Sequence, residues 1–283
     1  MKNVRQLIRT VILAILAVQM IAFSAVPALA APAAEAPAPL FPETGSKTKT
    51  DGRLTIDYSH IDQGYVMVRA KKTDLKMQLK VKHGSDSVSY LINGDGQYET
   101  IPLQFGNGSY QFTLYIAQKK GSNRCTGAGS ISLKCSMKDE LSCFLYPNQY
   151  VNYDADSPLI QKARELSSGL SDAEKIARKV CKFVYKYITY DMISSQTISA
   201  NQTKDLLPDI ATAWETRLGV CKDKSAVLCA MLRSLGIHAK LVIGTANGMP
   251  HAWVVVCADG KTIPLDPTDP AMRSRNYQAE RYY

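Results

Sequence analysis

The spacing of apolar residues changes near Tyr146, and this change constrains the fold of the 283-residue chain more than any other feature. From Gly52 to about Tyr146, apolar and polar residues alternate in short runs, as in strands with one buried face. After Tyr146 apolar residues recur at helical spacing, and three strand-like runs end the pattern. Strands followed by helices and an antiparallel meander predict an α+β fold.

The first half predicts a β-sandwich-like domain. Asn93-Gly94 stands between two apolar runs, which is a signal for a two-residue hairpin turn. Short strands at this spacing, with turn formers and no helical stretch between them, are typical of a small sandwich. His60 and His83 are isolated here, so binding or spacing is the expected role of this half. The expected strands span residues 53–58, 65–69, 75–81, 88–92 and 109–116.

The second half predicts helices and then strands. Ser171-Asp-Ala-Glu174 reads as a capping box that opens a helix ending at about Ile188. A polar loop is expected over residues 194–204. The helix that begins at Cys221 continues to Leu235 and stops at Gly236. The remaining expected elements are helices over residues 159–166 and 210–217 and strands over residues 239–244, 252–257 and 261–266.

Residues 1–30 read as a signal peptide. A basic n-region precedes an apolar stretch that ends in small residues acceptable to a signal peptidase, with cleavage after Ala30. An uncleaved membrane anchor is the alternative, and the shortness of the stretch disfavours it. We therefore expect a secreted protein with no stable membrane span after cleavage. The residues concerned are Lys2, Arg5 and Arg9, the stretch Val11–Val26, and Pro27-Ala28-Leu29-Ala30.

The segment after the signal peptide predicts a linker. Ala and Pro alternate over residues 31–39, a composition that cannot pack a core and favours extended chain. We expect the linker to cover residues 31–50, a β-rich domain to cover residues 51–147, and a second domain to cover residues 148–283. About 230 residues are enough for one large domain or two modest ones.

The formal net charge is +9, and three of these charges lie in the signal peptide. A mature surplus of about +6 favours anionic surroundings such as an acidic cell wall or acidic substrates, although an ordinary basic protein fits equally. The sequence holds no nucleic-acid motif and no basic run with interleaved aromatic residues.

The seven cysteines are odd in number and show no metal-ligand spacing. Cys125, Cys135 and Cys143 lie close together in the β-rich segment, where an oxidising compartment could join two of them. An odd count leaves at least one thiol free, which suits a reactive Cys221. We expect no metal and no cofactor.

Cys221 is the expected nucleophile. It opens a helix, and the free amides and partial positive charge of a helix start favour a thiolate. The same amides can bind a developing oxyanion. Gly219, two residues earlier, is expected to allow a tight turn into the helix.

His251 and Asp266 are the expected partners of Cys221. His251 opens a strand and Asp266 ends the next one, with the turn Ala258-Asp259-Gly260 between them. Counted outward from Asp259, the two residues lie at the same end of one hairpin. The carboxylate would then hold one ring nitrogen and leave the other for the thiol. Taken singly, each residue also has a structural interpretation. Cys221 could be a buried thiol, His251 a structural histidine, and Asp266 part of an ordinary turn.

These residues resemble the transglutaminase-like superfamily, which shares the papain-like fold. The resemblance covers about residues 171–268. It implies that Cys221 is the nucleophile, His251 the general base and acid, and Asp266 the orienting acid. The motifs that carry it are Gly219-Val-Cys221, Leu232-Arg-Ser-Leu-Gly236, Val242-Ile-Gly244, His251-Ala-Trp253, Asp266-Pro-Thr268 and the helix end Tyr187-Ile-Thr-Tyr190-Asp191.

Some features differ from the family or stay open. Many relatives carry a tryptophan shortly before the aspartate motif, where this chain has Ile263-Pro264-Leu265. The side-chain oxyanion donor has two candidates, Tyr190 and Trp214. Trp253 is expected to pack its strand against the helix, and Asp223 is expected to cap the Cys221 helix.

The resemblance implies a cysteine enzyme that hydrolyses or transfers the acyl groups of peptide or amide substrates, as a protease, amidase or transglutaminase. Carboxylate clusters typical of calcium sites are absent, which argues against the calcium control of the animal enzymes. The expected partner is a peptide or protein substrate, with the cell wall as one source and no nucleic acid. The alternative is a non-catalytic cell-surface binding or assembly module on the same scaffold.

Overall fold

The computed structural model describes residues 37–200, 207–273 and 276–283, with side chains in the helix that ends at Ala200 described up to Thr197. The predicted signal peptide and the first residues of the predicted linker therefore lie outside the described residues. Within the described ranges, no helix has both the length and the apolar character needed to cross a membrane. The described residues belong to one compact unit, and the boundary between residues 147 and 148 stays a prediction.

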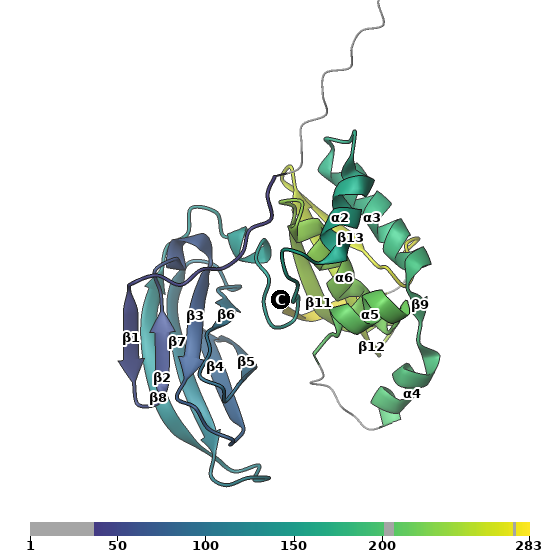
Figure 1. Ribbon diagram of the computed structural model, residues 1–283. Helices are drawn as coiled ribbons and strands as arrows, with labels where there is room; N and C mark the ends of the chain where they lie inside the picture. The colour runs from purple at the N-terminus through teal and green to yellow at the C-terminus, as the bar shows by residue number, and fades with distance from the viewer. Residues whose placement is uncertain (1–36, 201–206, 274–275) are drawn as a thin grey trace, which may run out of the picture. The chain divides into compact units, whose positions relative to one another are not determined.

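Two antiparallel four-stranded sheets form the β-rich part (Figure 1). One has the order β1-β2-β3-β6 and the other the order β5-β4-β7-β8, and β1 and β2 contact β8 of the second sheet. Apolar side chains of both sheets share one core. The strands are β1 Thr48–Asp51, β2 Leu54–Asp57, β3 Tyr65–Ala70, β4 Met77–His83, β5 Asp86–Ile92, β6 Glu99–Pro102, β7 Gly108–Ala117 and β8 Cys125–Cys135.

The hairpin predicted at Asn93-Gly94 is wrong. β5 ends at Ile92, and the chain then crosses to the other sheet, where β6 pairs with β3. A Cβ atom at Gly94 would lie 1.9 Å from the carbonyl oxygen of Thr73, so this glycine serves a close backbone approach. The tight hairpin lies earlier, where His83 pairs with Asp86 around a two-residue turn.

Three strands of the sandwich escaped prediction. The first three residues of β1 lie within the segment expected to be linker, where the β-branched residues of Thr48-Lys-Thr50 suit a strand. β6 is short, with only four residues, and β8 opens with small and polar residues that mask its later alternation. None of the three shows the apolar run that marks the strands around it.

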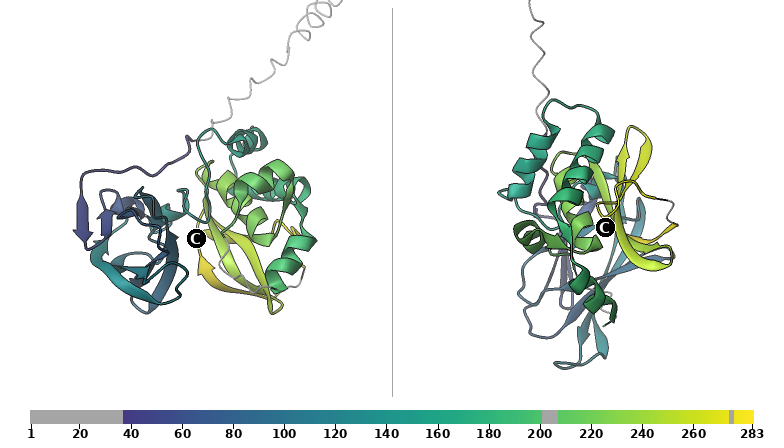
Figure 2. Two further views of the ribbon diagram at one scale, coloured as in Figure 1. Left: turned by 60° about the horizontal axis from the view of Figure 1, so that its bottom comes forward. Right: turned by 90° about the vertical axis from the view of Figure 1, so that its right-hand side faces the viewer.

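The remainder consists of helices on one face of a four-stranded antiparallel sheet (Figure 2). The sheet order is β13-β12-β11-β14, and a short parallel pair, β9 with β10, lies apart from it. The α+β prediction is confirmed. The helices are α2 Pro158–Ser167, α3 Ala173–Tyr187, α4 Met192–Ala200, α5 Ile210–Thr216 and α6 Cys221–Arg233; the strands are β9 Thr189–Tyr190, β10 Leu218–Gly219, β11 His238–Ala246, β12 Met249–Ala258, β13 Lys261–Leu265 and β14 Tyr277–Tyr282.

Two local predictions in this part are corrected. The polar loop expected from residue 194 begins as helix α4, because Asp191 accepts hydrogen bonds from the backbone and hydroxyl of Ser194 and starts a turn. Residues 201–204 of that expected loop lie outside the described residues. Helix α3 is capped by Asp172 rather than Ser171, and the Asp172 carboxylate accepts from the backbone N–H of Lys175 at 3.0 Å.

Helix α6 is the centre of the helical part. It contacts β11 and β12 on one side and α2, α3 and α5 on the others. Every residue from Lys224 to Arg233 is buried, so polar side chains within it need partners inside the protein. The hydroxyl of Ser225, for example, donates to the carbonyl of Ala252 at 3.1 Å and ties the helix to β12.

Arg233 lies at the end of α6 and is completely buried. Its guanidinium donates to the carbonyl oxygens of Ala239 at 2.9 Å, Tyr146 at 2.8 Å and Tyr283 at 2.7 Å. These carbonyls belong to β11, to the segment that follows the sandwich, and to the residue after β14. One planar side chain thus joins three segments that are far apart in the sequence.

We expect Arg233→Met to lower the free energy of unfolding by about 3–5 kcal/mol, because three buried carbonyls lose their donors. Urea unfolding followed by circular dichroism measures this change. Arg164→Met is the matched control, since Arg164 is exposed on α2 and should change stability by no more than about 0.5 kcal/mol. Equal stabilities for the two variants would contradict the role given to Arg233.

Candidate active site

Cys221 is the first residue of α6 and is half-buried. The helix start is fixed by Asp223, whose carboxylate accepts from the backbone N–H of Val220 at 3.0 Å and of Asp209 at 3.1 Å. Burial raises the pKa of Asp223, and these hydrogen bonds counteract part of that effect. Asp223 therefore acts as a cap, as the sequence suggests, and holds the chain just before the thiol.

The turn that precedes Cys221 differs from expectation. Gly219 does not adopt a positive φ; the left-handed residue is Arg217, with φ of 58°. Gly219 instead serves packing, because a Cβ atom there would lie 3.1 Å from the Cβ of Asp223 and 3.3 Å from that of Ala213. The glycine allows α5 and α6 to lie close to the strand between them.

Asp266 follows β13, and its side chain is completely buried. Its Oδ1 accepts from the N–H of Thr268 at 2.7 Å, from the Thr268 hydroxyl at 2.6 Å and from the N–H of Asp269 at 3.3 Å. Its Oδ2 accepts from His251 and from Tyr277, each at 2.8 Å. Burial alone would raise the pKa of Asp266, but the bonds from His251 and Thr268 outweigh it and lower the pKa to about 2.

His251 lies on β12, and its side chain is 10% exposed. Its Nε2 bonds to Asp266, so Nδ1 is the ring nitrogen left for the hydrogen bond between His251 and Cys221. Burial lowers the pKa of His251, whereas the hydrogen bonds to Asp266 and Cys221 and their charges raise it to about 9. The structure therefore brings the three expected residues together in the order thiol, imidazole, carboxylate.

Tyr190 also contacts Cys221. β9 pairs with β10 in parallel, with Tyr190 opposite Gly219, and the N–H of Asp191 donates to the Gly219 carbonyl at 3.1 Å. The Tyr190 hydroxyl interacts with the Cys221 side chain and backbone and with the hydroxyl of Ser195 at 3.2 Å. Burial raises the pKa of Tyr190, which keeps the phenol protonated and able to donate.

Trp214, the other candidate oxyanion donor, lies in an aromatic cluster. Its ring centroid is 4.7 Å from that of Tyr187 and 6.2 Å from that of Phe183, both on α3. These contacts give Trp214 a packing role between α5 and α3. Trp253 is buried on β12, beside the ring of His251 and edge-on to Tyr277 at 5.0 Å.

Two residues near the site were not anticipated. Lys224, one turn after Cys221, is buried and donates from Nζ to the carbonyls of Tyr185, at 3.3 Å, and Ile188 at the end of α3. Burial lowers its pKa to about 8, against the raising effect of the Asp266 charge. Tyr277 comes from β14, which was not predicted. The sequence did not reveal Lys224, because a lysine in a helix is normally exposed. It did not reveal Tyr277, because β14 is rich in polar residues and does not read as a buried strand.

All seven cysteines are free thiols in the structure. Cys125 and Cys135 stand at opposite ends of β8, about 33 Å apart for an 11-residue strand, which rules out a bond between them. Cys135, Cys143, Cys181 and Cys229 are buried. Within the described ranges, no three His, Cys, Asp or Glu side chains gather as a metal site would require.

The site therefore holds a thiol at a helix start, an imidazole bonded to a buried carboxylate, and a tyrosine hydroxyl next to the sulfur. The model of the Transglutaminase-like superfamily matches residues 160–267. This part of the chain is a transglutaminase-like domain, and the resemblance read from the motifs is confirmed.

Individual relatives are distant. A centrosomal protein of 76 kDa from Danio rerio is 21% identical over 257 residues, which is 80% of this chain and 37% of that protein. The chain thus spans little more than a third of that relative's length. Among solved structures, a TGase is 22% identical over 42% of this chain and 32% of its own, with a TM-score of 0.35. The periplasmic domain of TgpA from Pseudomonas aeruginosa is 12% identical over 81% of this chain and 96% of its own, with a TM-score of 0.37.

We expect His251 to make stability depend on pH. Its pKa of about 9 in the folded state lies above its ordinary value of 6.5, so protonation stabilises the fold. This contribution is fully present below about pH 6.5 and is lost as the pH rises through about 9. The difference in free energy of unfolding between wild type and His251→Gln should therefore shrink by about 1–3 kcal/mol from pH 6 to pH 10. Urea unfolding at each pH tests this, and a constant difference would contradict it.

Proposed function

We propose that the chain is an exported cysteine enzyme that opens amide bonds of peptides or proteins through a thioester on Cys221. The observation that carries the proposal is the position of the His251 ring, which bonds to Asp266 through Nε2 at 2.8 Å and to Cys221 on its other side. This arrangement supplies a base for the thiol and an acid for the leaving group in one side chain.

In the first step, His251 accepts the thiol proton of Cys221 at Nδ1, and the sulfur attacks the amide carbonyl carbon. The imidazolium that forms is stabilised by the buried Asp266 carboxylate. The tetrahedral intermediate then collapses, its carbon–nitrogen bond breaks, and His251 returns the proton to the leaving amine. The product is a thioester on Cys221.

In the intermediate, the carbonyl oxygen carries a negative charge that needs donors. The backbone N–H of Cys221 belongs to the first turn of α6, where amides lack a partner within the helix. The Tyr190 hydroxyl interacts with this N–H and with the sulfur. The two groups are therefore placed to donate together to an oxygen bonded to the carbon that the sulfur attacks.

In the second step, a nucleophile attacks the thioester while His251 accepts its proton; the carbon–sulfur bond then breaks, and His251 returns the proton to the Cys221 sulfur. Water gives a carboxylate and completes hydrolysis, whereas a primary amine gives a new amide and completes acyl transfer. The same three side chains serve both outcomes. Both release the Cys221 thiol for another cycle.

Export and the substrate class rest on the sequence. The signal-peptide pattern, the Ala/Pro-rich segment and the positive charge of +9 favour work on peptides outside the cytoplasm, with the cell wall as one source. The two-sheet part would contribute binding or spacing there.

We expect a glutamine-bearing peptide or a wall-derived peptide to be modified by the full-length protein. Mass spectrometry would show loss of ammonia with incorporation of an added primary amine for acyl transfer, or cleavage with uptake of water for hydrolysis. Cys221→Ala should abolish either product, and iodoacetamide-treated wild type should behave like that variant. Unchanged peptides throughout, with Cys221 alkylated no faster than a cysteine in unfolded chain, would reject the enzyme and favour a binding module.

We expect Tyr190→Phe to lower the turnover number by about 10²-fold, because the intermediate loses one oxyanion donor. Alkylation of Cys221 by iodoacetamide develops no oxyanion and should change much less. Trp214→Phe is the matched control, since Trp214 packs against α3 and should leave turnover within about twofold. Equal turnover for Tyr190→Phe and wild type would remove Tyr190 from the oxyanion site.

A further inference from the structure

Tyr277 contacts the candidate site from a strand that sequence patterns did not reveal. Its hydroxyl donates to Asp266 Oδ2 at 2.8 Å, the same oxygen that accepts from His251. Its ring lies edge-on to Trp253 at 5.0 Å and 6.0 Å from the ring of His251. Tyr277 therefore contacts both the orienting carboxylate and the strand that carries the base.

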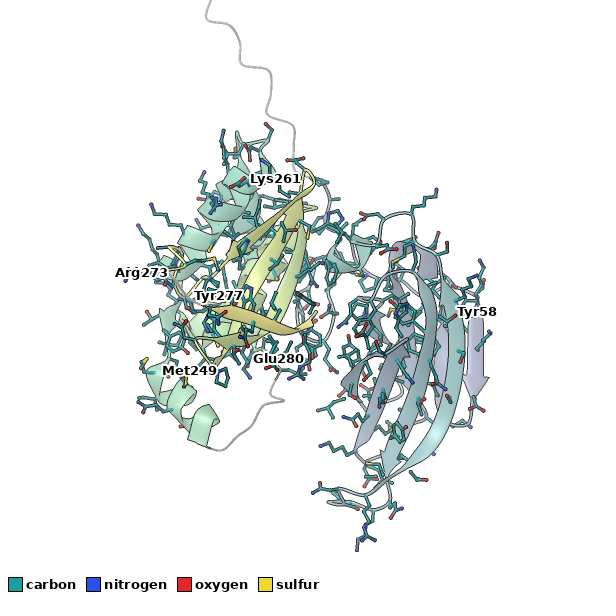
Figure 3. All side chains as sticks on the ribbon, turned by 180° about the vertical axis from the view of Figure 1, so that it is seen from behind. Tyr58, Met249, Lys261, Arg273, Tyr277 and Glu280 are labelled. Carbon is teal, nitrogen blue, oxygen red and sulfur yellow. The ribbon has the colours of Figure 1, made fainter. Side chains whose placement is uncertain are left out.

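The path of β14 explains how Tyr277 reaches Asp266. In the sheet order β13-β12-β11-β14, β14 lies at the edge opposite β13, which Asp266 follows. β14 pairs antiparallel with β11, with Tyr277 opposite Ala246, and Figure 3 shows Tyr277 at one end of β14 and Glu280 further along it. The backbone of β14 lies close over Gly244 of β11, and the Tyr277 hydroxyl reaches Asp266.

Gly244 permits the close approach of β14. It pairs with His251 on β12, so a side chain at Gly244 would point to the same face as His251. A Cβ atom there would lie 2.0 Å from the carbonyl oxygen of Gln278 on β14, a distance no side chain can adopt. The register between β11 and β14 also shifts between Ile243 and Gly244. β14 thus lies over the His251 face where β11 has no side chain.

The two carboxylate oxygens of Asp266 have separate donors. Thr268 and Asp269 hold Oδ1 from the loop after β13. Tyr277 donates to Oδ2, the oxygen that also accepts from His251. The Tyr277 bond therefore helps to fix the direction in which Oδ2 faces the imidazole.

We propose that Tyr277 is a positioning residue of this site, which holds Asp266 Oδ2 in line with the His251 ring. This proposal rests on the proposed function for its consequence in turnover, and on the geometry alone for its effect on His251. A matched pair of variants is available on one strand: Tyr277→Phe removes the bonded hydroxyl, while Tyr282→Phe removes the hydroxyl of an exposed tyrosine on β14.

The test uses nuclear magnetic resonance on the full-length protein, in which only four histidines contribute signals. We expect the Nε2 proton of His251 to exchange with water at least about tenfold faster in Tyr277→Phe than in wild type, because the acceptor is no longer held in line. Cys221 alkylation near pH 7 should slow by about tenfold in the same variant. Tyr282→Phe should match wild type in both measurements.

The outcomes separate the two proposals. Faster proton exchange in Tyr277→Phe, in a wild type that modifies no peptide, would support Tyr277 as a positioning residue while rejecting the enzyme. Equal exchange and equal alkylation in Tyr277→Phe and wild type would overturn the role of Tyr277, even where wild type turns over peptides. The Phe ring retains the contact with Trp253, so the variant keeps its packing; equal slowing in Tyr282→Phe would indicate a general effect of β14 and would also overturn the role.

Discussion

The burial of α6 is the constraint on which the rest of this structure depends. A helix enclosed on all sides must find internal partners for each polar group it carries. Arg233 satisfies this requirement at one end by donating to three backbone carbonyls. At the other end Lys224 donates to carbonyls at the end of α3, and Asp223 accepts from backbone amides. The helix that carries Cys221 is therefore fixed at both ends by charged side chains.

Burying the Arg233 charge costs desolvation energy, and hydrogen bonds to nearby carbonyls offset that cost. A buried cation is destabilising unless its donors are satisfied, and the shown partners of Arg233 are neutral carbonyls from segments that must first come together. The favourable energy of Arg233 therefore appears only when the three segments have assembled. Arg233, which joins these three segments, thus makes assembly of the helical part cooperative.

Asp266 presents the complementary problem of a buried anion. Hydrogen bonds reach its two oxygens from the loop after β13, from β12 and from β14. The donors that make the charge tolerable also fix its orientation, so stabilising Asp266 and aligning His251 are one physical event. This explains why residues as separate as Thr268 and Tyr277 belong to one site.

The sequence predicts the parts of this site that local context defines. Cys221 at a helix start and the hairpin between His251 and Asp266 can be read from capping and turn residues, and the structure places His251 and Asp266 2.8 Å apart. Tyr277 could not be found this way, because its contact depends on the close approach of β14 to Gly244. Lys224 was missed because a lysine on a helix is expected to face solvent. The hairpin turn predicted at Asn93-Gly94 was wrong because Gly94 instead allows a close backbone contact with Thr73.

In the proposed reaction, the fate of the thioester depends on how far water is excluded from it. Water is present at far higher concentration than any amine, so transfer requires that a bound partner exclude it. Leu218, Met249 and Met192 are exposed, and each lies within three residues of Cys221, His251 or Tyr190 along the chain. In the proposed reaction, the buried contacts would account for formation of the thioester, whereas cover over these apolar side chains would determine which nucleophile resolves it.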